Sequence, residues 1–348
     1  MINSPVNERS TRARQRSRGK VCVFTTGGTI AMLETHDGQG LMPARTGMQL
    51  LDAVPDLASV CDIELREFSN LPSPHIHPRD IFALRNIIRE IIDRDDVDGV
   101  VVTHGTDTLE ESAYLMELTL SHHKPVVFTA AMKPGSTIGA DGPMNILSAC
   151  MVAVSREARG HGVLVVMNEE IHTAREVRKT YTSNVATFHS PGYGPIGLVD
   201  SDRVIFLRKS LIRQKFDVSH LEEKVGLIKV CEGNDDLFIR CAIDNNFAGL
   251  VIEGFGRGDV PPGMVASITQ AISSGMVLVM TSRCFQGRVL GVYGYDGGGA
   301  DLKRRGVLFC GDLSGPKARI KLMVALASTR DRNKLDSIME MEDISWGK

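Results

Sequence analysis

The chain has 348 residues, of which 43% are hydrophobic and 24% are charged, so it can bury a substantial core and is not a disordered protein. At about 100–200 residues per domain, this length predicts two domains or one unusually large one. The formal net charge is −2, and every apolar run is far shorter than the roughly 20 residues that a membrane-spanning helix needs. These features exclude integral membrane proteins and fibrous proteins.

The charge is unevenly distributed along the chain. Residues 9–20 carry six basic and no acidic side chains, and without them the chain has 34 basic and 42 acidic residues. A body with this excess of negative charge does not attract nucleic acid broadly. We therefore expect residues 1–19 to form a flexible, solvated arm, in preference to a nucleic-acid-binding segment or a mitochondrial presequence. No apolar stretch typical of a secretory signal follows its charges.

The seven cysteines are odd in number, widely scattered and without a C-x-x-C pair. Several lie within apolar runs, as Cys22 does. This pattern predicts reduced core residues in a cytoplasmic protein, and neither a disulfide framework nor a structural zinc site.

Short apolar runs alternate with amphipathic stretches in the first two thirds of the chain. Strands are predicted at residues 21–24, 99–103, 124–130 and 162–167. Helices are predicted at residues 78–93, 108–120 and 145–156. Because valine-rich strands separated by helices form parallel sheets with both faces covered, this region predicts an α/β domain over residues 20–207.

Residues 208–224 are charged and lack a strand pattern, which predicts a linker. Beyond it, strands are predicted at residues 225–230, 249–253 and 277–281, and helices at 235–244, 261–273 and 316–328. The sequence therefore predicts a second, smaller α/β domain over residues 225–348.

The first polar loop follows the strand predicted at 21–24 and reads Thr25-Thr26-Gly27-Gly28-Thr29. Open α/β sheets place their sites at the carboxyl ends of parallel strands, and paired glycines let the backbone approach a ligand closely. The spacing matches neither G-x-G-x-x-G nor a P-loop, so a dinucleotide-binding turn is not favoured. Taken alone, the loop leaves a catalytic hydroxyl and a plain tight turn equally open.

The second polar loop, Thr103-His104-Gly105-Thr106-Asp107-Thr108, lies between a predicted buried strand and a predicted helix. Thr108 and Glu111 fit a capping box, which has a purely structural role. Capping does not explain Thr106 and Asp107. A hydroxyl beside a carboxylate at a helix N-terminus suits proton transfer or binding of an amino acid's charged ends.

A threonine hydroxyl becomes a good nucleophile only when a base removes its proton. His104 is one candidate base, although its place at the end of a strand favours a role in orienting the backbone. Lysine can also act as a base in a suitable environment. For Lys179, however, spacing alone favours a solvated lysine in a polar loop.

The motifs of the chain resemble those of the bacterial-type L-asparaginase/glutaminase family over about residues 20–330. The two signature motifs correspond to Thr26-Gly27-Gly28-Thr29-Ile30-Ala31 and His104-Gly105-Thr106-Asp107-Thr108. Further similar runs are Ala140-Asp141-Gly142-Pro143-Met144-Asn145, Val185-Ala186-Thr187-Phe188, Tyr193-Gly194-Pro195, Gly311-Asp312-Leu313 and Lys317-Ala318-Arg319.

The resemblance implies two α/β domains and a homotetramer built as a dimer of dimers, with active sites between the N-terminal domain of one chain and the C-terminal domain of its neighbour. It implies hydrolysis of a small-molecule amino-acid amide, foremost L-asparagine to L-aspartate and ammonia, through a threonine acyl-enzyme and without metal or organic cofactor. Thr29 corresponds to the nucleophile, and Thr106, Asp107 and Lys179 correspond to the second catalytic triad. Asp107 also corresponds to the contact for the substrate α-amino group, and Ser73 to the contact for its α-carboxylate; Thr106 is a further expected substrate-binding residue.

The chain departs from the family pattern at several positions that contact substrate. Leu41 stands where the family has a loop tyrosine that assists the nucleophile, and the first tyrosine of the chain is Tyr114. Pro74 replaces a polar contact and has neither a side-chain nor a backbone donor. In the C-terminal domain Asp259 aligns with an asparagine that the neighbouring chain presents to the substrate, and Asp296 is a further candidate for that role.

These departures leave three functions open. The first is an L-asparaginase-type amidohydrolase. The second is a hydrolase of another amide or acyl group, since leucine and proline favour a bulkier, less polar ligand. The third is a regulator that binds an amino acid without turnover, although Thr29, Thr106 and Lys179 argue against it because binding alone has little use for two hydroxyls and a base. A tRNA-linked amidotransferase is less favoured because the body of the chain is acidic.

Overall fold

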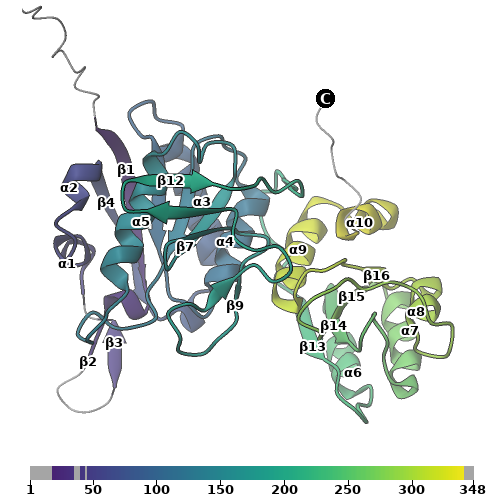
Figure 1. Cartoon of the computed structure of the whole chain (residues 1–348). Coiled ribbons are helices and arrows are strands. Elements are labelled where there is room, and N and C mark those ends of the chain that lie inside the picture. The colour runs from purple at the N-terminus through teal and green to yellow at the C-terminus, as the bar shows by residue number, and fades with distance from the viewer. Residues whose placement is uncertain (1–17, 35–39, 44, 341–348) are drawn as a thin grey trace, which may run out of the picture.

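The computed structural model describes residues 18–34, 40–43 and 45–340 of the chain. These residues form two α/β domains, each built on its own main sheet (Figure 1). The larger domain is N-terminal, as the sequence predicts, and this confirms the predicted fold class. None of the helices in the described ranges is both long and apolar enough to cross a bilayer.

The N-terminal sheet has eight strands in the order β12-β11-β8-β7-β6-β5-β1-β4. Five consecutive strands are parallel: β4 (Cys61–Leu71), β1 (Gly19–Gly27), β5 (Gly99–Thr103), β6 (Val126–Thr129) and β7 (Val163–Met167). The remaining three are antiparallel additions: β8 (Glu170–Thr173), β11 (Gly197–Asp200) and β12 (Arg203–Phe206). A tight turn through Asn168 and Glu169, both with positive φ, joins β7 to β8 and reverses the chain direction.

Helices cover both faces of this sheet because alternate side chains of its strands point to opposite sides. On β1, Cys22 and Phe24 pack toward α3 (Pro78–Ile92) and α4 (Leu109–Thr119). Val21 and Val23 pack toward the opposite face. That face is covered by α1 (Gly47–Asp52), α2 (Leu57–Val60) and α5 (Gly142–Val154).

The C-terminal sheet is wholly parallel and has the order β13-β14-β15-β16. Its strands are β13 (Val225–Lys229), β14 (Gly249–Gly254), β15 (Val277–Ser282) and β16 (Leu308–Phe309). Its outer face is covered by α6 (Leu237–Asp244), α7 (Val265–Ser273) and α8 (Gly299–Arg305). Its inner face packs on α9 (Gly315–Ser328), and α10 (Arg332–Met339) lies against α9.

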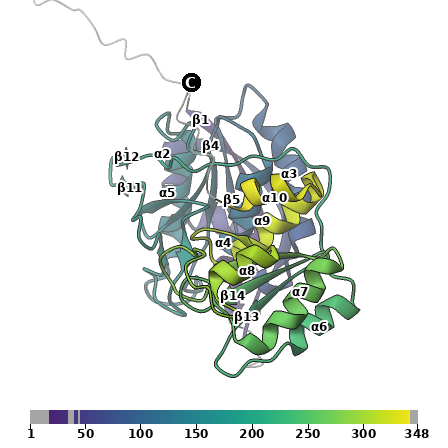
Figure 2. The ribbon, with the colours of Figure 1, turned by 90° about the vertical axis from the view of Figure 1, so that its right-hand side faces the viewer.

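Helix α9 joins the two domains into one packed unit. It contacts α4 of the N-terminal domain and the strands β13 to β15 of the C-terminal domain. Figures 1 and 2 both show it at the junction between the domains. One buried apolar cluster therefore runs from Phe24 and α4, through Leu322 of α9, to Val251 and Val279 of the second sheet.

Residues 208–224, predicted to be a linker, contain no helix or strand. The segment is nevertheless held against the N-terminal domain. Arg213 and Lys215 both pair with the buried carboxylate of Glu117 on α4, at 3.2 and 2.9 Å. Arg85 of α3 donates to the carbonyl of Val218 at 2.8 Å.

Several short elements complete the fold. They are the strands β2 (Met32–Glu34), β3 (Leu41–Pro43), β9 (Arg178–Lys179) and β10 (Phe188–His189), and the 3-10 helices η1 (Thr29–Ala31), η2 (Ser73–His75) and η3 (Pro262–Met264). All seven cysteines are free thiols. The expectation that they lie in the core is wrong for Cys231, Cys241 and Cys284, which are exposed.

Candidate functional site

The two polar loops lie against each other because β1 and β5 are neighbouring parallel strands. Thr25 and Thr103 face each other in the register of the two strands, so both loops leave the same edge of the sheet. The hydroxyl of Thr26 donates to the carbonyl of Thr103 at 2.9 Å. The first loop is therefore fixed to the end of the strand that carries the second.

The contact between the loops is made by two glycines and leaves no room for a side chain. Gly28 has a φ of 83°, and a Cβ atom built on it would lie 2.3 Å from the Cα atom of Gly105. Thr29 and Thr106 directly follow these glycines in the chain. Thr29 is half-buried and begins η1, whereas Thr106 is buried. Both threonines are thus positioned by the same backbone contact.

The side chain of Lys179 reaches the second loop from β9. Its ammonium lies 2.8 Å from the hydroxyl oxygen of Thr106 and 2.7 Å from a carboxylate oxygen of Asp107. The Lys179 side chain is 16% exposed, so the alternative of a freely solvated lysine is wrong. Asp107 is 59% exposed and has room for a second, cationic partner.

The backbone of Lys179 is also held, by a residue that the sequence analysis did not identify. The Lys179 N–H donates to the carboxylate of Glu110 at 2.7 Å, and β9 pairs with Phe188 of β10. Glu110 lies in the first turn of α4, directly after the second polar loop. Acidic residues are common there because of the helix dipole, so no sequence signal distinguishes Glu110 from its neighbour Glu111.

Ser73 lies beside the second loop, at the start of η2. It is buried, and a Cβ atom on Gly105 would lie 2.7 Å from its hydroxyl oxygen. The hydroxyl of Thr108 donates to the Ser73 carbonyl at 3.1 Å. The predicted capping box of Thr108 and Glu111 is therefore wrong: Thr108 is the N-cap of α4, but its side chain makes no cap hydrogen bond and binds η2 instead.

His104 orients the backbone of the loop. Its ring is fully buried, and burial lowers the pKa of His104 to about 4, so the imidazole is neutral near pH 7. Its Nδ1 atom lies 2.8 Å from the carbonyl oxygen of Gly105, and in a neutral ring that nitrogen carries the proton and donates it. This geometry matches the structural role that the sequence favours for His104.

Asp259 lies in the C-terminal domain, away from this group of residues. Its carboxylate accepts the N–H of Gly299 at 2.9 Å. Asp296, the other acidic candidate, pairs with Arg305 at 3.2 Å. The cavity beside the ammonium of Lys179 has a volume of about 330 Å³ and is lined by Asp107, Lys179, Thr180, Tyr181 and Thr182, so neither Asp259 nor Asp296 lines it. Within one chain, the described structure thus brings neither aspartate to the site.

Of the two positions near the first and second loops at which the sequence departs from the family pattern, the structure describes the side chain of one, Pro74, and not that of the other, Leu41. Pro74 lies in η2 next to Ser73 and is exposed. Leu41 belongs to β3, but its side chain, like residues 35–39, lies outside the described part of the chain.

Comparison with known proteins agrees with this arrangement of fold and loops. Residues 20–212 match the family model "Asparaginase, N-terminal", and residues 224–339 match "Glutaminase/Asparaginase C-terminal domain". The fold and these matches define a two-domain α/β enzyme of the amidohydrolase class. The chain belongs to the bacterial-type asparaginase/glutaminase family, which confirms the resemblance found in its motifs.

Named relatives and solved structures are similar over most of the chain. An L-asparaginase from Bacillus licheniformis is 38% identical over 318 residues, which cover 90% of this chain and 97% of the relative. A glutaminase-asparaginase from Pseudomonas fluorescens biotype A is 32% identical and covers 90% of this chain and 88% of its own length. The crystal structure of a probable cytoplasmic L-asparaginase from Campylobacter jejuni aligns with a TM-score of 0.84 at 31% identity, covering 92% of this chain and 99% of that one.

Proposed function

We propose that this protein hydrolyses the side-chain amide of L-asparagine to L-aspartate and ammonia. The observation that carries the proposal is the contact of the Lys179 ammonium with both the Thr106 hydroxyl and the Asp107 carboxylate. A buried hydroxyl next to a lysine and beside the glycine contact that positions Thr29 suits proton transfer in acyl transfer. Membership of the asparaginase/glutaminase family supports the same reaction.

In the proposed mechanism, the Thr29 oxygen attacks the amide carbon and forms a tetrahedral intermediate. Collapse of this intermediate breaks the C–N bond, and ammonia leaves with the proton taken from the threonine hydroxyl. The product is an ester between Thr29 and the aspartyl group. Water then attacks this ester with its proton passing through Thr106 and Lys179, which releases aspartate and restores the Thr29 hydroxyl. Backbone N–H groups near Thr106 stabilise the oxyanion.

Substrate recognition is proposed to rest on Asp107 and Ser73. The exposed carboxylate of Asp107 binds the α-amino group, and Ser73 contacts the α-carboxylate. Asp259 of a second chain completes the site in a homotetramer built as a dimer of dimers. We also propose a cytoplasmic location, which seven free thiols favour.

A second candidate is hydrolysis of a different amide, with glutamine as the first to test. The exposed Pro74 beside Ser73 favours it, because proline has neither a side-chain nor a backbone donor for a polar substrate group. The Pseudomonas relative named a glutaminase-asparaginase supports including glutamine.

Steady-state ammonia release tests these alternatives. The parent protein and Thr29→Ala are each assayed with L-asparagine, L-glutamine and D-asparagine. We expect L-asparagine to give the highest kcat/KM and Thr29→Ala to be inactive. A preference for glutamine supports the second candidate. If asparagine raises the unfolding midpoint but releases no ammonia, the protein is an amino-acid-binding regulator and the proposal fails.

A further inference from the structure

The ammonium of Lys317, near the start of α9, is enclosed by backbone carbonyl groups. It donates to the carbonyls of Ala174 at 2.8 Å and Arg175 at 3.0 Å, and also to that of Val177. The side chain is 1% exposed. A lysine ammonium has three donors, so these three carbonyls use its full hydrogen-bonding capacity. No reaction step proposed above uses this buried cation.

The three carbonyls belong to the turn that leads directly into the strand of Lys179. The turn follows β8, and β9 with Lys179 begins after Val177. A second contact from the C-terminal domain holds the same turn: Asp312, just before α9, accepts from the buried Arg175 at 2.6 Å. The turn that precedes Lys179 is therefore held by two residues, Lys317 within α9 and Asp312 just before it.

Helix α9 is a rigid support for these contacts. It is buried between the two domains, and its apolar side chains belong to the cluster that joins both sheets. Figure 2 shows it against α4, the helix that carries Glu110. Glu110 in turn accepts the backbone N–H of Lys179. The turn at 174–177 and β9 are thus held between α9 on one side and the first turn of α4 on the other.

We propose that Lys317 is a positioning residue for Lys179: by binding the three carbonyls of the 174–177 turn, it holds the Lys179 ammonium at the hydroxyl of Thr106. This inference rests on the proposed function for its effect on catalysis, but not for the anchoring of the turn. A misplacement of about 1 Å at a reacting group costs on the order of 100-fold in rate, so loosening the turn lowers kcat. The proposed substrate-binding groups on Ser73 and Asp107 belong to other segments, so KM changes little.

The chain offers a matched control on the same helix face. Lys321 lies one helical turn after Lys317 and is also buried, at 3% exposure. Burial lowers the pKa of both ammonium groups to about 8. Lys321, however, faces the carbonyl of Met339 in α10 at 3.4 Å, not the 174–177 turn. If removing any buried lysine from α9 lowers kcat by destabilising the protein, substitutions of Lys317 and of Lys321 lower it alike. If Lys317 positions Lys179, only the substitution of Lys317 lowers kcat.

The experiment compares the full-length parent with Lys317→Met, Lys317→Arg and Lys321→Met. Asparagine-dependent ammonia release gives kcat and KM, and amide hydrogen exchange is followed by mass spectrometry in the peptides that cover 174–181. We expect Lys317→Met to lower kcat by about 10- to 100-fold with KM within about threefold, and to speed exchange in these peptides. Lys317→Arg, which keeps charged donors, recovers part of kcat, and Lys321→Met matches the parent in both measurements.

A kcat for Lys317→Met within threefold of the parent, or an equal loss in Lys321→Met, overturns the proposal. If Lys317→Met does not fold, Lys317→Gln takes its place, since its amide keeps two donors without a charge, and the same limits apply. If the parent itself releases no ammonia, the proposed function fails while the exchange data still decide whether Lys317 anchors the turn. Unchanged exchange at 174–181 in the Lys317 variant overturns the anchoring.

Discussion

The Nζ atom of Lys179 lies 2.8 Å from the hydroxyl oxygen of Thr106, although the two residues are 73 positions apart in the chain. Thr106 follows a central strand of the N-terminal sheet, whereas Lys179 lies in a two-residue strand outside that sheet. The same ammonium pairs with Asp107 at 2.7 Å. An ammonium, a hydroxyl and a carboxylate from two separate segments are thus within hydrogen-bond distance, the relationship on which the proposed hydrolysis depends.

Replacing Lys179 by methionine is expected to lower kcat for asparagine by about 10²- to 10⁴-fold, because a positioned acid or base contributes a factor of that size. Methionine is unbranched and one heavy atom shorter than lysine, and it keeps most of the aliphatic side chain while losing the charge and the donors, so the unfolding midpoint stays close to that of the parent. Ammonia release and thermal unfolding are the measurements. Lys334→Met, at an exposed position on α10, is the control and keeps full activity. A Lys179→Met enzyme with parental kcat would show that another group handles the proton.

Gly28→Ala is expected to destabilise the protein by about 1–3 kcal/mol and to lower kcat, since a Cβ atom cannot fit against Gly105. The two loops must then separate, which moves Thr29 away from Thr106. Gly192→Ala is the control for a positive φ: its φ is 80°, close to the 83° of Gly28, but a Cβ atom there meets nothing within 4 Å. This control measures the cost of a positive φ without a steric contact, about 1 kcal/mol, whereas Gly28 combines its positive φ with an extended ψ of −177°. Equal unfolding midpoints and equal kcat in the two variants would contradict a tight loop contact.

Asp259 is expected to act on the site of a neighbouring chain. Thr29→Ala and Asp259→Ala are each predicted to have little activity, yet subunits of the two variants, unfolded together and reassembled, recover about a quarter of parental activity. In a two-fold dimer with shared sites, half of the random pairs contain one intact site out of two. Ammonia release after mixing is the measurement, with each variant refolded alone as the control. Absence of recovery in a mixed oligomer would place Asp259 outside the site.

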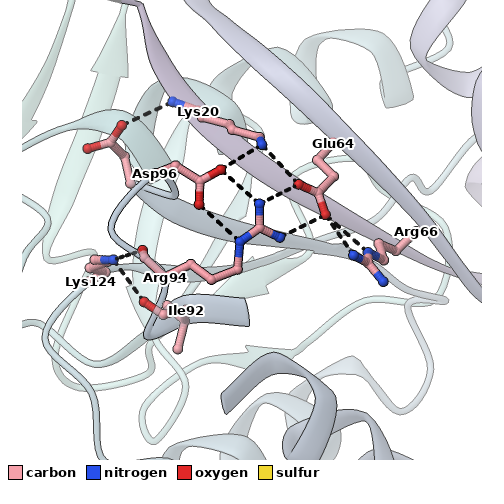
Figure 3. A network of polar contacts seen from close by, with 8 residues as sticks. Lys20, Glu64, Arg66, Ile92, Arg94, Asp96 and Lys124 are labelled. Atoms are coloured by element: carbon pink, nitrogen blue, oxygen red, sulfur yellow. Dashed lines mark hydrogen bonds and ion pairs between the residues drawn. The ribbon is translucent and has the colours of Figure 1, made fainter. Parts of the chain in front are cut away.

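Stability in acid is expected to depend on Glu64, at the centre of a network of charged residues at the start of β1 and β4 (Figure 3). Its carboxylate accepts from Arg94 at 2.9 and 3.0 Å and also pairs with Arg66 and Lys20. The hydrogen bonds from Arg94, then those from Arg66 and Lys20, lower the pKa of Glu64 to about 2. A carboxyl group whose pKa is lowered in the folded state stabilises the fold at pH values above its unfolded-state pKa, which is near 4.5. This stabilisation is lost as the pH falls toward the folded-state pKa of about 2.

Glu64→Gln removes this dependence. We expect this substitution to lower the free energy of unfolding by roughly 0.5–1 kcal/mol at pH 7, the upper range for a partly exposed ion pair. The loss is smaller at pH 3, because part of the Glu64 carboxylate's contribution to stability is already lost in the parent at that pH. Urea unfolding at both pH values measures the difference. Asp202→Asn, which breaks an exposed pair with Arg203, is the control and changes stability little at either pH. A Glu64→Gln penalty that is constant from pH 7 to pH 3 would contradict the linkage.

The family, the fold class and the location of the two polar loops follow from the sequence alone. Apolar runs separated by amphipathic stretches predicted β1, β5, β7 and their helices, because burial on two faces of a sheet leaves a local pattern. The short strands between residues 170 and 206 were not predicted, since two- to four-residue strands carry too few positions to show a period. The long edge strand β4 was also missed, because it is only half-buried and its charged side chains conceal the alternation.

At the candidate site, the sequence proposed Thr29, Thr106, Asp107 and Lys179, and the tertiary structure decided how they are arranged. The pattern around Lys179 is that of an ordinary polar loop, and only packing brings it to Thr106. Glu110, which accepts the backbone N–H of Lys179, has no sequence signal of its own, and the run Lys317-Ala318-Arg319 resembles the family without indicating what Lys317 contacts. Lys317 is about 140 positions from the carbonyls it binds. Residue patterns report the local backbone and its burial, whereas contacts over such separations depend on how helices and turns pack in three dimensions.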